Sequence, residues 1–107
     1  MTYSKISMQD LKSKFSNLSS DELVLDVRSA DEFRDGHVPG SRNIPHEAVG
    51  SFVNELKSFR NIYVHCQKGG RAVKAADVLA GLGLKNIICV VDSGMHDWIE
   101  AGHPMER

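Results

Sequence analysis

The chain has 107 residues, with 13 Lys and Arg, 14 Asp and Glu, and a formal net charge of −1 at pH 7. This length provides one domain with a buried core, so we expect a single domain over residues 1–107. The balanced charge argues against bulk binding of nucleic acid or of an anionic membrane, and no apolar run is long enough for a membrane span.

The first part of the chain predicts a short helix followed by a buried strand. Ser7-Met-Gln-Asp10 has the pattern of a capping box, and an apolar stripe follows it at Leu11, Phe15 and Leu18. Residues 17–21 are polar and predict a loop. Residues 23–27 are apolar except for Asp26, which favours a strand in a parallel sheet covered by helices on both faces.

Residues 29–59 predict two helices separated by a turn. Ser29, with Glu32 three positions later, is typical of a helix start, and we expect this helix over 29–35. Val38-Pro-Gly40 predicts a turn, and residues 43–44 leave room for only a very short strand before a proline. A second helix is predicted over 46–59 from an apolar stripe at Val49, Phe52, Val53, Leu56 and Phe59.

A cysteine lies between the next strand and the next helix. The β-branched and aromatic run 62–64 predicts a buried strand, and apolar spacing over 72–82 predicts a helix ended by Gly83. Cys66 is therefore placed at the carboxyl end of a strand and beside a helix N-terminus, whose first N–H groups are unpaired and carry partial positive charge.

The residues around Cys66 predict an anion site with a reactive thiolate. Gly69 and Gly70 allow backbone with φ > 0, which turns several N–H groups inward, and Lys68 and Arg71 add formal positive charge. Such a field favours the thiolate and makes it nucleophilic. An inert cysteine at a strand end is the alternative, but it requires neither the glycine pair nor the cations.

The rest of the chain completes an alternation of strands and helices. Residues 87–91 predict a central strand, in which Cys89 is a small core residue, and residues 95–100 predict a last helix that ends before Gly102 and Pro104. Right-handed crossovers then give an open parallel sheet with the Cys66 loop at its carboxyl edge. With no apolar leader and no expected disulfide, we expect a cytoplasmic protein.

Three motifs resemble the rhodanese family of thiosulfate sulfurtransferases. Cys66-Gln-Lys-Gly-Gly-Arg71 fits the C-x-x-G-x-R active loop, residues 26–45 resemble the amino-terminal signature, and residues 93–104 resemble the carboxyl-terminal one. The resemblance covers about residues 6–104. It implies an α/β fold, with a five-stranded parallel sheet and helices on both faces, and sulfur transfer that needs no metal or other cofactor.

The resemblance also implies roles for the loop residues. Cys66 would attack thiosulfate and carry the sulfur as a persulfide, and the substrate would be held by Gln67, Lys68, Gly69, Gly70 and Arg71. In this family cationic loop residues accompany thiosulfate and neutral ones mercaptopyruvate, so Lys68 favours thiosulfate. The implied acceptors are cyanide, a small thiol or a thioredoxin-like protein.

Other polar residues are interpreted as structural. Asp26, Arg28 and Glu32 are expected to form a salt-bridged scaffold that supports the site rather than to act as acids or bases. Strand alternation directs His65 away from Cys66, which predicts a hydrogen-bonded structural histidine. The remaining histidines lack metal-ligand spacing, and Trp98 is expected to anchor the last helix.

Two alternative functions and one departure from the family pattern remain. A persulfide carrier for a dedicated protein partner uses the same loop. A cysteine-dependent phosphatase is the second alternative, although only four residues separate Cys66 from Arg71 where the phosphatase signature has five. Ser93 stands where the family usually has a glycine, so it could adjust the pocket wall or donate a hydrogen bond to the ligand.

Overall fold

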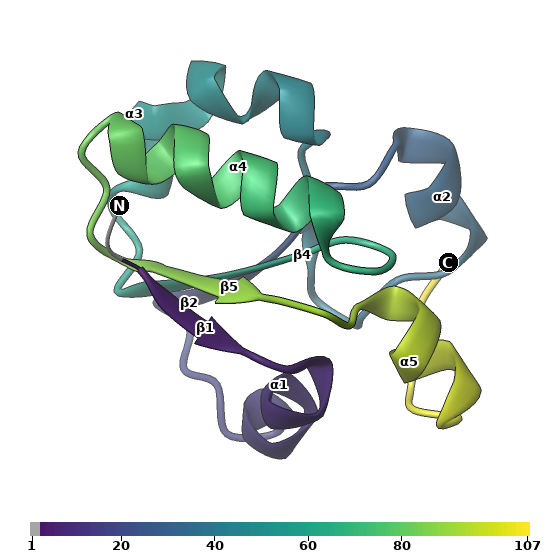
Figure 1. Cartoon of the computed structure of the whole chain (residues 1–107). Helices are drawn as coiled ribbons and strands as arrows, with labels where there is room; N and C mark the ends of the chain where they lie inside the picture. The colour runs from purple at the N-terminus through teal and green to yellow at the C-terminus, as the bar shows by residue number, and fades with distance from the viewer. Residues whose placement is uncertain (1–2) are drawn as a thin grey trace.

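The computed structural model describes residues 3–107 and contains one sheet in which every strand pair is parallel (Figure 1). This confirms the predicted α/β fold with a five-stranded parallel sheet. The order across the sheet is β1-β5-β4-β2-β3, which places β4 in the centre. The strands are β1 (Ser4–Ile6), β2 (Glu22–Asp26), β3 (Arg42–Asn43), β4 (Asn61–His65) and β5 (Ile87–Val90).

Helices cover both faces of the sheet, as predicted, and Figure 1 shows α1 and α5 below it and α4 above it. The lower helices are α1 (Met8–Phe15) and α5 (Met95–Glu100). The upper layer consists of the 3-10 helix η1 (His46–Phe52), α3 (Val53–Leu56) and α4 (Gly70–Gly81). The short helix α2 (Ala30–Asp35) lies at the carboxyl edge of the sheet, beyond the strand ends.

The alternation of side chains along the central strands divides the core into two layers. In β4, Ile62 and Val64 join the layer beneath α4, whereas Tyr63 joins the layer that includes Met8, Met95 and Trp98. Successive side chains of a strand point to opposite faces, so both layers come from the same strand. Because helices cover both faces, these strands have the nearly continuous apolar sequences of a buried parallel sheet.

Local signals at the helix ends agree with the structure. The Ser7 hydroxyl accepts the N–H of Asp10 at 3.0 Å, and the Asp10 carboxylate accepts the N–H of Ser7 at 3.0 Å, which confirms the first capping box. The second box, between Ser29 and Glu32, has the same two bonds at 3.3 and 3.2 Å. The backbone after α4 turns at Gly83 with φ +96°, so this glycine ends the helix as predicted.

Two parts of the fold differ from the predictions. β1 was not predicted, because its three residues are mostly exposed and become a strand only through pairing with β5. The single α-helix predicted over 46–59 is wrong, since η1 and the one-turn helix α3 replace it. Gly50 and Ser51 are weak helix formers in the middle of this segment, whereas Val49 and Leu56 still reach the core, which explains the apolar stripe.

No helix within residues 3–107 combines the length and the hydropathy that crossing a membrane requires.

Candidate active site

The loop between β4 and α4 surrounds the sulfur of Cys66 with backbone donors. The Sγ atom accepts the N–H of Gly69 at 3.1 Å and the N–H of Ala72 at 3.3 Å. Cys66 is only 1% exposed and lies at the base of α4. Backbone N–H groups at a helix N-terminus attract negative charge, so the sulfur lies at a position suited to an anion.

The start of α5 holds the cysteine loop from the other side. The N–H of Met95 donates to the carbonyl of Cys66 at 2.8 Å, and the N–H of His96 donates to the carbonyl of Gln67 at 3.1 Å. Between them, a Cβ at Gly94 would lie 2.3 Å from the Cys66 carbonyl oxygen and 2.6 Å from that of Gln67. Only glycine therefore allows these two segments to approach so closely.

The glycine pair within the loop behaves differently from the prediction. Gly69 has φ +121°, and a Cβ there would lie 2.9 Å from the backbone N of Asp92. Gly70 has no positive φ and is the first residue of α4, so the predicted left-handed conformation is wrong for this residue. A Cβ on Gly70 would meet nothing within 4 Å, which leaves open space at the front of the helix.

Cys66 opens into a pocket of about 360 Å³. Its lining contains four of the residues predicted to bind substrate, Gln67, Lys68, Gly70 and Arg71, together with Lys74. The sequence interpretation missed Lys74. Its position could have been predicted from helical spacing, because a residue three after Arg71 and four after Gly70 lies on the same helix face as these two residues. Gly69 contributes through its N–H to the sulfur rather than through the lining.

Arg71 is paired with Glu32 across the pocket edge. The two guanidinium nitrogens donate to the two carboxylate oxygens at 2.6 and 3.0 Å, a bidentate geometry. The hydrogen bond from Arg71 lowers the pKa of Glu32 to about 2, and the same bond raises the pKa of Arg71. Glu32 is itself held by Ser29 at the start of α2, so this pair fixes α2 against the first turn of α4.

Asp26 and Arg28 form a second, buried pair. Arg28 Nη2 lies 2.8 Å from Asp26 Oδ2, with exposed side-chain fractions of 3% and 0%. The same guanidinium donates to the Gln67 side-chain oxygen at 3.2 Å and to the Gly36 carbonyl at 2.8 Å. The three residues predicted to form one scaffold thus belong to two pairs, Asp26 with Arg28 and Glu32 with Arg71. The first pair contacts the cysteine loop through Gln67, and the second through Arg71 itself.

His65 lies beneath the loop on the opposite side of the strand from Cys66. It is completely buried, and its Nδ1 is 3.4 Å from the Cys66 carbonyl oxygen. Nε2 has no hydrogen-bond partner within residues 3–107 and lies 4.0 Å from Asp26 Oδ2. Burial lowers the pKa of His65, so the ring is neutral near pH 7 and does not act as a charged group beside the sulfur.

Cys89 is the second free thiol and lies on β5 in the layer beneath α4. Burial, with a smaller contribution from the charge of Cys66, raises its pKa to about 11. This agrees with the prediction of a core residue. Within the described part of the chain, no three His, Cys, Asp or Glu side chains are grouped as a metal site.

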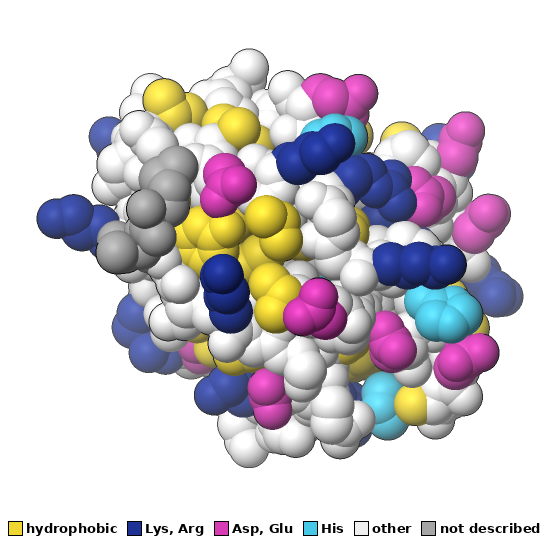
Figure 2. Space-filling model, viewed as in Figure 1, with side chains coloured by type: hydrophobic (Ala, Val, Ile, Leu, Met, Phe, Trp, Pro, Cys, Tyr) yellow, Lys and Arg dark blue, Asp and Glu magenta, His cyan; other side chains and the backbone are white. Residues whose placement is uncertain are grey.

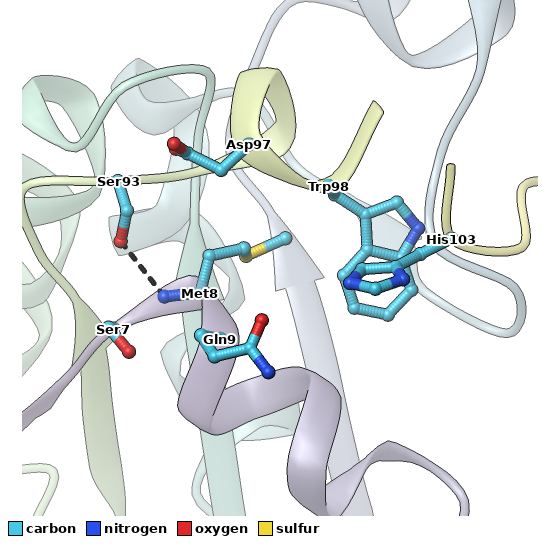
Figure 3. Close-up of a pocket in the computed structure, with 7 residues that line it drawn as sticks. All are labelled: Ser7, Met8, Gln9, Ser93, Asp97, Trp98 and His103. Atoms are coloured by element: carbon cyan, nitrogen blue, oxygen red, sulfur yellow. Dashed lines mark hydrogen bonds between the residues drawn. The ribbon is translucent and has the colours of Figure 1, made fainter. Parts of the chain in front are cut away.

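A second cavity, of about 240 Å³, lies between α1 and α5 (Figure 3). Ser93 lines this cavity rather than the Cys66 pocket. Its hydroxyl accepts the N–H of Met8 at 2.9 Å and donates to the Val91 carbonyl at 2.8 Å, and Figure 3 draws the first of these bonds. Ser93 therefore joins the start of α1 to the segment before α5, and neither role suggested by the sequence describes it. The cavity is lined by Ser7, Met8, Gln9, Ser93, Asp97, Trp98 and His103.

Known proteins match most of this chain, both in sequence and in structure. A family model described as "Rhodanese-like domain" matches residues 7–101. The putative sulfur carrier protein YrkF of Bacillus subtilis is 38% identical over 88% of this chain, but the chain spans only 50% of that protein. Thiosulfate sulfurtransferase 16 of Arabidopsis thaliana is 34% identical, covering 75% of this chain and 76% of that protein. A solved rhodanese-related protein from Thermoplasma volcanium superposes with a TM-score of 0.79 at 32% identity, over 97% of this chain and 98% of the other.

Proposed function

Because this chain belongs to the rhodanese family, we propose that it moves sulfane sulfur from thiosulfate to a thiophilic acceptor through a persulfide on Cys66. The relatives named as sulfurtransferases and as a sulfur carrier support sulfur transfer in general. Thiosulfate as donor, Cys66 as nucleophile and the nature of the acceptor are the specific parts of the proposal.

The first half-reaction is a displacement at sulfur. The Cys66 thiolate attacks the outer sulfur of thiosulfate and forms a new S–S bond, while the bond to the sulfonate sulfur breaks and sulfite leaves with its electron pair. The charge of the thiolate ends on the terminal sulfur of the persulfide. No net oxidation occurs, and no metal or organic cofactor takes part.

The observation that carries this proposal is the pair of N–H groups directed at the Cys66 sulfur, from Gly69 at 3.1 Å and from Ala72 at 3.3 Å. These donors are fixed by the turn at Gly69 and by the first turn of α4, so stabilising the thiolate needs little rearrangement. The first N–H groups of α4, at Gly70 and Arg71, have no carbonyl partner within the helix. They are available to the terminal sulfur of the persulfide.

The charges around the pocket support a dianionic donor. Lys68 and Lys74 line the pocket as cations, and Arg71 lines it with its charge already paired to Glu32. A doubly charged sulfonate gains more from these cations than a monoanion does. We therefore propose thiosulfate over a singly charged donor such as mercaptopyruvate.

The second half-reaction returns the thiolate. Cyanide or a thiolate attacks the outer sulfur of the persulfide, and Cys66 leaves as the thiolate that began the cycle. A carrier role, in which the acceptor is a dedicated protein such as a thioredoxin-like one, is the second candidate, and the relative named as a sulfur carrier favours it.

The two free thiols fit a reducing compartment, and we propose the cytoplasm.

Steady-state production of thiocyanate from thiosulfate and cyanide tests the enzymatic proposal. We expect turnover in the wild type and none above background in Cys66→Ser, since the hydroxyl cannot form a persulfide. Lys68→Ala should raise the KM for thiosulfate by about three- to tenfold with a smaller change in kcat, because it removes one exposed charge from the pocket. Full activity of Cys66→Ser would refute the proposal. If a persulfide forms but cyanide turns over slowly while a protein thiol reacts rapidly, the carrier role is favoured.

A further inference from the structure

We propose that the outer surface of α4 is a docking face for an acidic protein that supplies the acceptor thiol. The docking face consists of Lys68 and Lys74 at the pocket and Val78 and Leu82 farther along the helix. This inference rests on the proposed function, because it identifies the class of acceptor that the Cys66 persulfide serves.

The depth of Cys66 limits how an acceptor can reach it. With the cysteine only 1% exposed, the acceptor sulfur must enter the pocket of about 360 Å³. A protein can do this only with a cysteine on a protruding segment, and the rest of its surface then rests on the residues around the mouth. The face that surrounds this mouth therefore selects the partner.

Two lysines at the mouth of the Cys66 pocket have no acidic partner among residues 3–107. Arg71 is neutralised by its bidentate pair with Glu32. Lys68 and Lys74 are exposed, and no carboxylate among residues 3–107 lies within 4.0 Å of either ammonium group. The whole chain carries a net charge of −1, so this local positive charge does not follow from the overall composition. It complements an acidic surface.

The apolar half of the docking face follows Lys74 along the helix. Val78 and Leu82 are four and eight residues after Lys74, and they are 46% and 53% exposed. A Cβ built on Gly50 of η1 would lie 3.8 Å from Val78 and 3.7 Å from Leu82, so η1 packs beside both side chains with only a glycine, and about half of each stays exposed. Figure 2 shows apolar side chains over the far end of α4, and cations nearer the β4–α4 loop. A charged region beside an apolar one is typical of an interface for a protein rather than for a small anion.

The transfer across this interface balances without a further reactant. The acceptor thiolate attacks the outer sulfur of the Cys66 persulfide, the new S–S bond forms on the acceptor, and the old one breaks. Cys66 leaves as a thiolate, and the negative charge of the attacking group ends on the acceptor persulfide.

Two synthetic peptides of equal length test the charge preference. Each contains one cysteine and two leucines, and the remaining positions are glutamate in one and lysine in the other. The persulfide form is prepared with thiosulfate, freed of excess donor, mixed with either peptide, and followed by mass spectrometry in a single turnover. We expect transfer to the acidic peptide to be about tenfold faster, and we expect high salt to reduce this preference.

Variants locate the effect on the docking face. Lys74→Glu should remove or reverse the preference for the acidic peptide, whereas Lys14→Glu, the same charge change on α1 at the opposite face of the sheet, should leave it unchanged. Val78→Ser with Leu82→Ser should slow transfer to the acidic peptide severalfold and leave turnover with thiosulfate and cyanide unchanged, because neither residue lines the pocket.

Three results would overturn the docking proposal: equal rates for both peptides, equal effects of the two lysine variants, or peptides that react no faster than 2-mercaptoethanol. Each can occur while cyanide still discharges the persulfide, so the proposed function would stand. If thiosulfate forms no persulfide, the donor assignment fails instead. Loading Cys66 with inorganic polysulfide then still allows the peptide comparison to be made.

Discussion

Gly94→Ala tests whether the close approach of α5 sets the position of the cysteine loop. The added Cβ would lie 2.3 Å from the carbonyl oxygen of Cys66, 2.6 Å from that of Gln67 and 2.7 Å from the Gln67 carbonyl carbon. All three are backbone atoms, so no side chain can rotate away. Restoring an ordinary contact requires the loop and α5 to separate by about 1 Å, which strains the bonds from Met95 and His96 at 2.8 and 3.1 Å.

The expected loss has two parts. Overpacking of a tightly packed site costs about 1–3 kcal/mol, which for a domain of this size lowers the Tm by roughly 4–12 °C. A displacement of about 1 Å in the reacting group lowers kcat by about a hundredfold. Gly50→Ala is the matched control, because its Cβ would meet only ordinary contacts at 3.7 and 3.8 Å.

Thermal unfolding followed by circular dichroism, together with turnover of thiosulfate and cyanide, measures both parts. We expect Gly50→Ala to match the wild type in both assays. A Gly94→Ala protein with the Tm and kcat of the wild type would refute the idea that this glycine positions the loop.

Three further predictions follow from the contacts around the site. Glu32 has its pKa lowered from 4.5 to about 2, so its pair with Arg71 stabilises the fold fully above about pH 4.5 and is lost as the pH falls towards 2. The stability difference between the wild type and Glu32→Gln, from urea unfolding, should be constant between pH 5 and 7 and shrink on acidification below that range; a difference that grows would contradict the pairing. Iodoacetamide at pH 8 should label Cys66, which opens into the pocket, and spare Cys89, which lies in the core beneath α4 and has a pKa of about 11. Equal labelling of the two thiols in the folded protein would contradict this difference. Trp98→Ala should lower the free energy of unfolding by about 3–5 kcal/mol, because the indole ring is completely buried. Trp98→Phe should lower it by less, because this change mainly removes the 2.7 Å bond from the indole N–H to the Pro104 carbonyl. Equal losses for the two variants would show that packing around the ring is unimportant.

The features that the sequence predicted correctly depend on short stretches of chain. The capping box of Ser7 links residues three apart, and the turn at Gly69 lies between the strand and the helix that it connects. Propensity, capping and turn chemistry act over such distances, so a local pattern is sufficient to predict them. The Cys66 loop belongs to this class, and for that reason its position at the carboxyl edge of the sheet was predictable.

The partners of Ser93 and of Glu32, and the strand β1, were not predicted because they depend on contacts between distant residues. The hydroxyl of Ser93 binds the N–H of Met8, 85 residues away, and the Arg71 guanidinium binds Glu32, 39 residues away. Nothing in the spacing of these residues identifies the partner. β1 likewise depends on its register with β5 rather than on its own composition. Lys74 differs, since helical spacing from Arg71 would have indicated it.

The mass of the intact protein after brief exposure to thiosulfate is the most direct test of the central claim, that Cys66 carries sulfur as a persulfide. The wild type should gain the mass of one sulfur atom and lose it again on addition of cyanide, whereas Cys66→Ser should gain nothing. The claim would be contradicted if Cys66→Ser also gained the mass of one sulfur atom. It would also be contradicted if the wild type gained no mass although its Cys66 reacts with iodoacetamide.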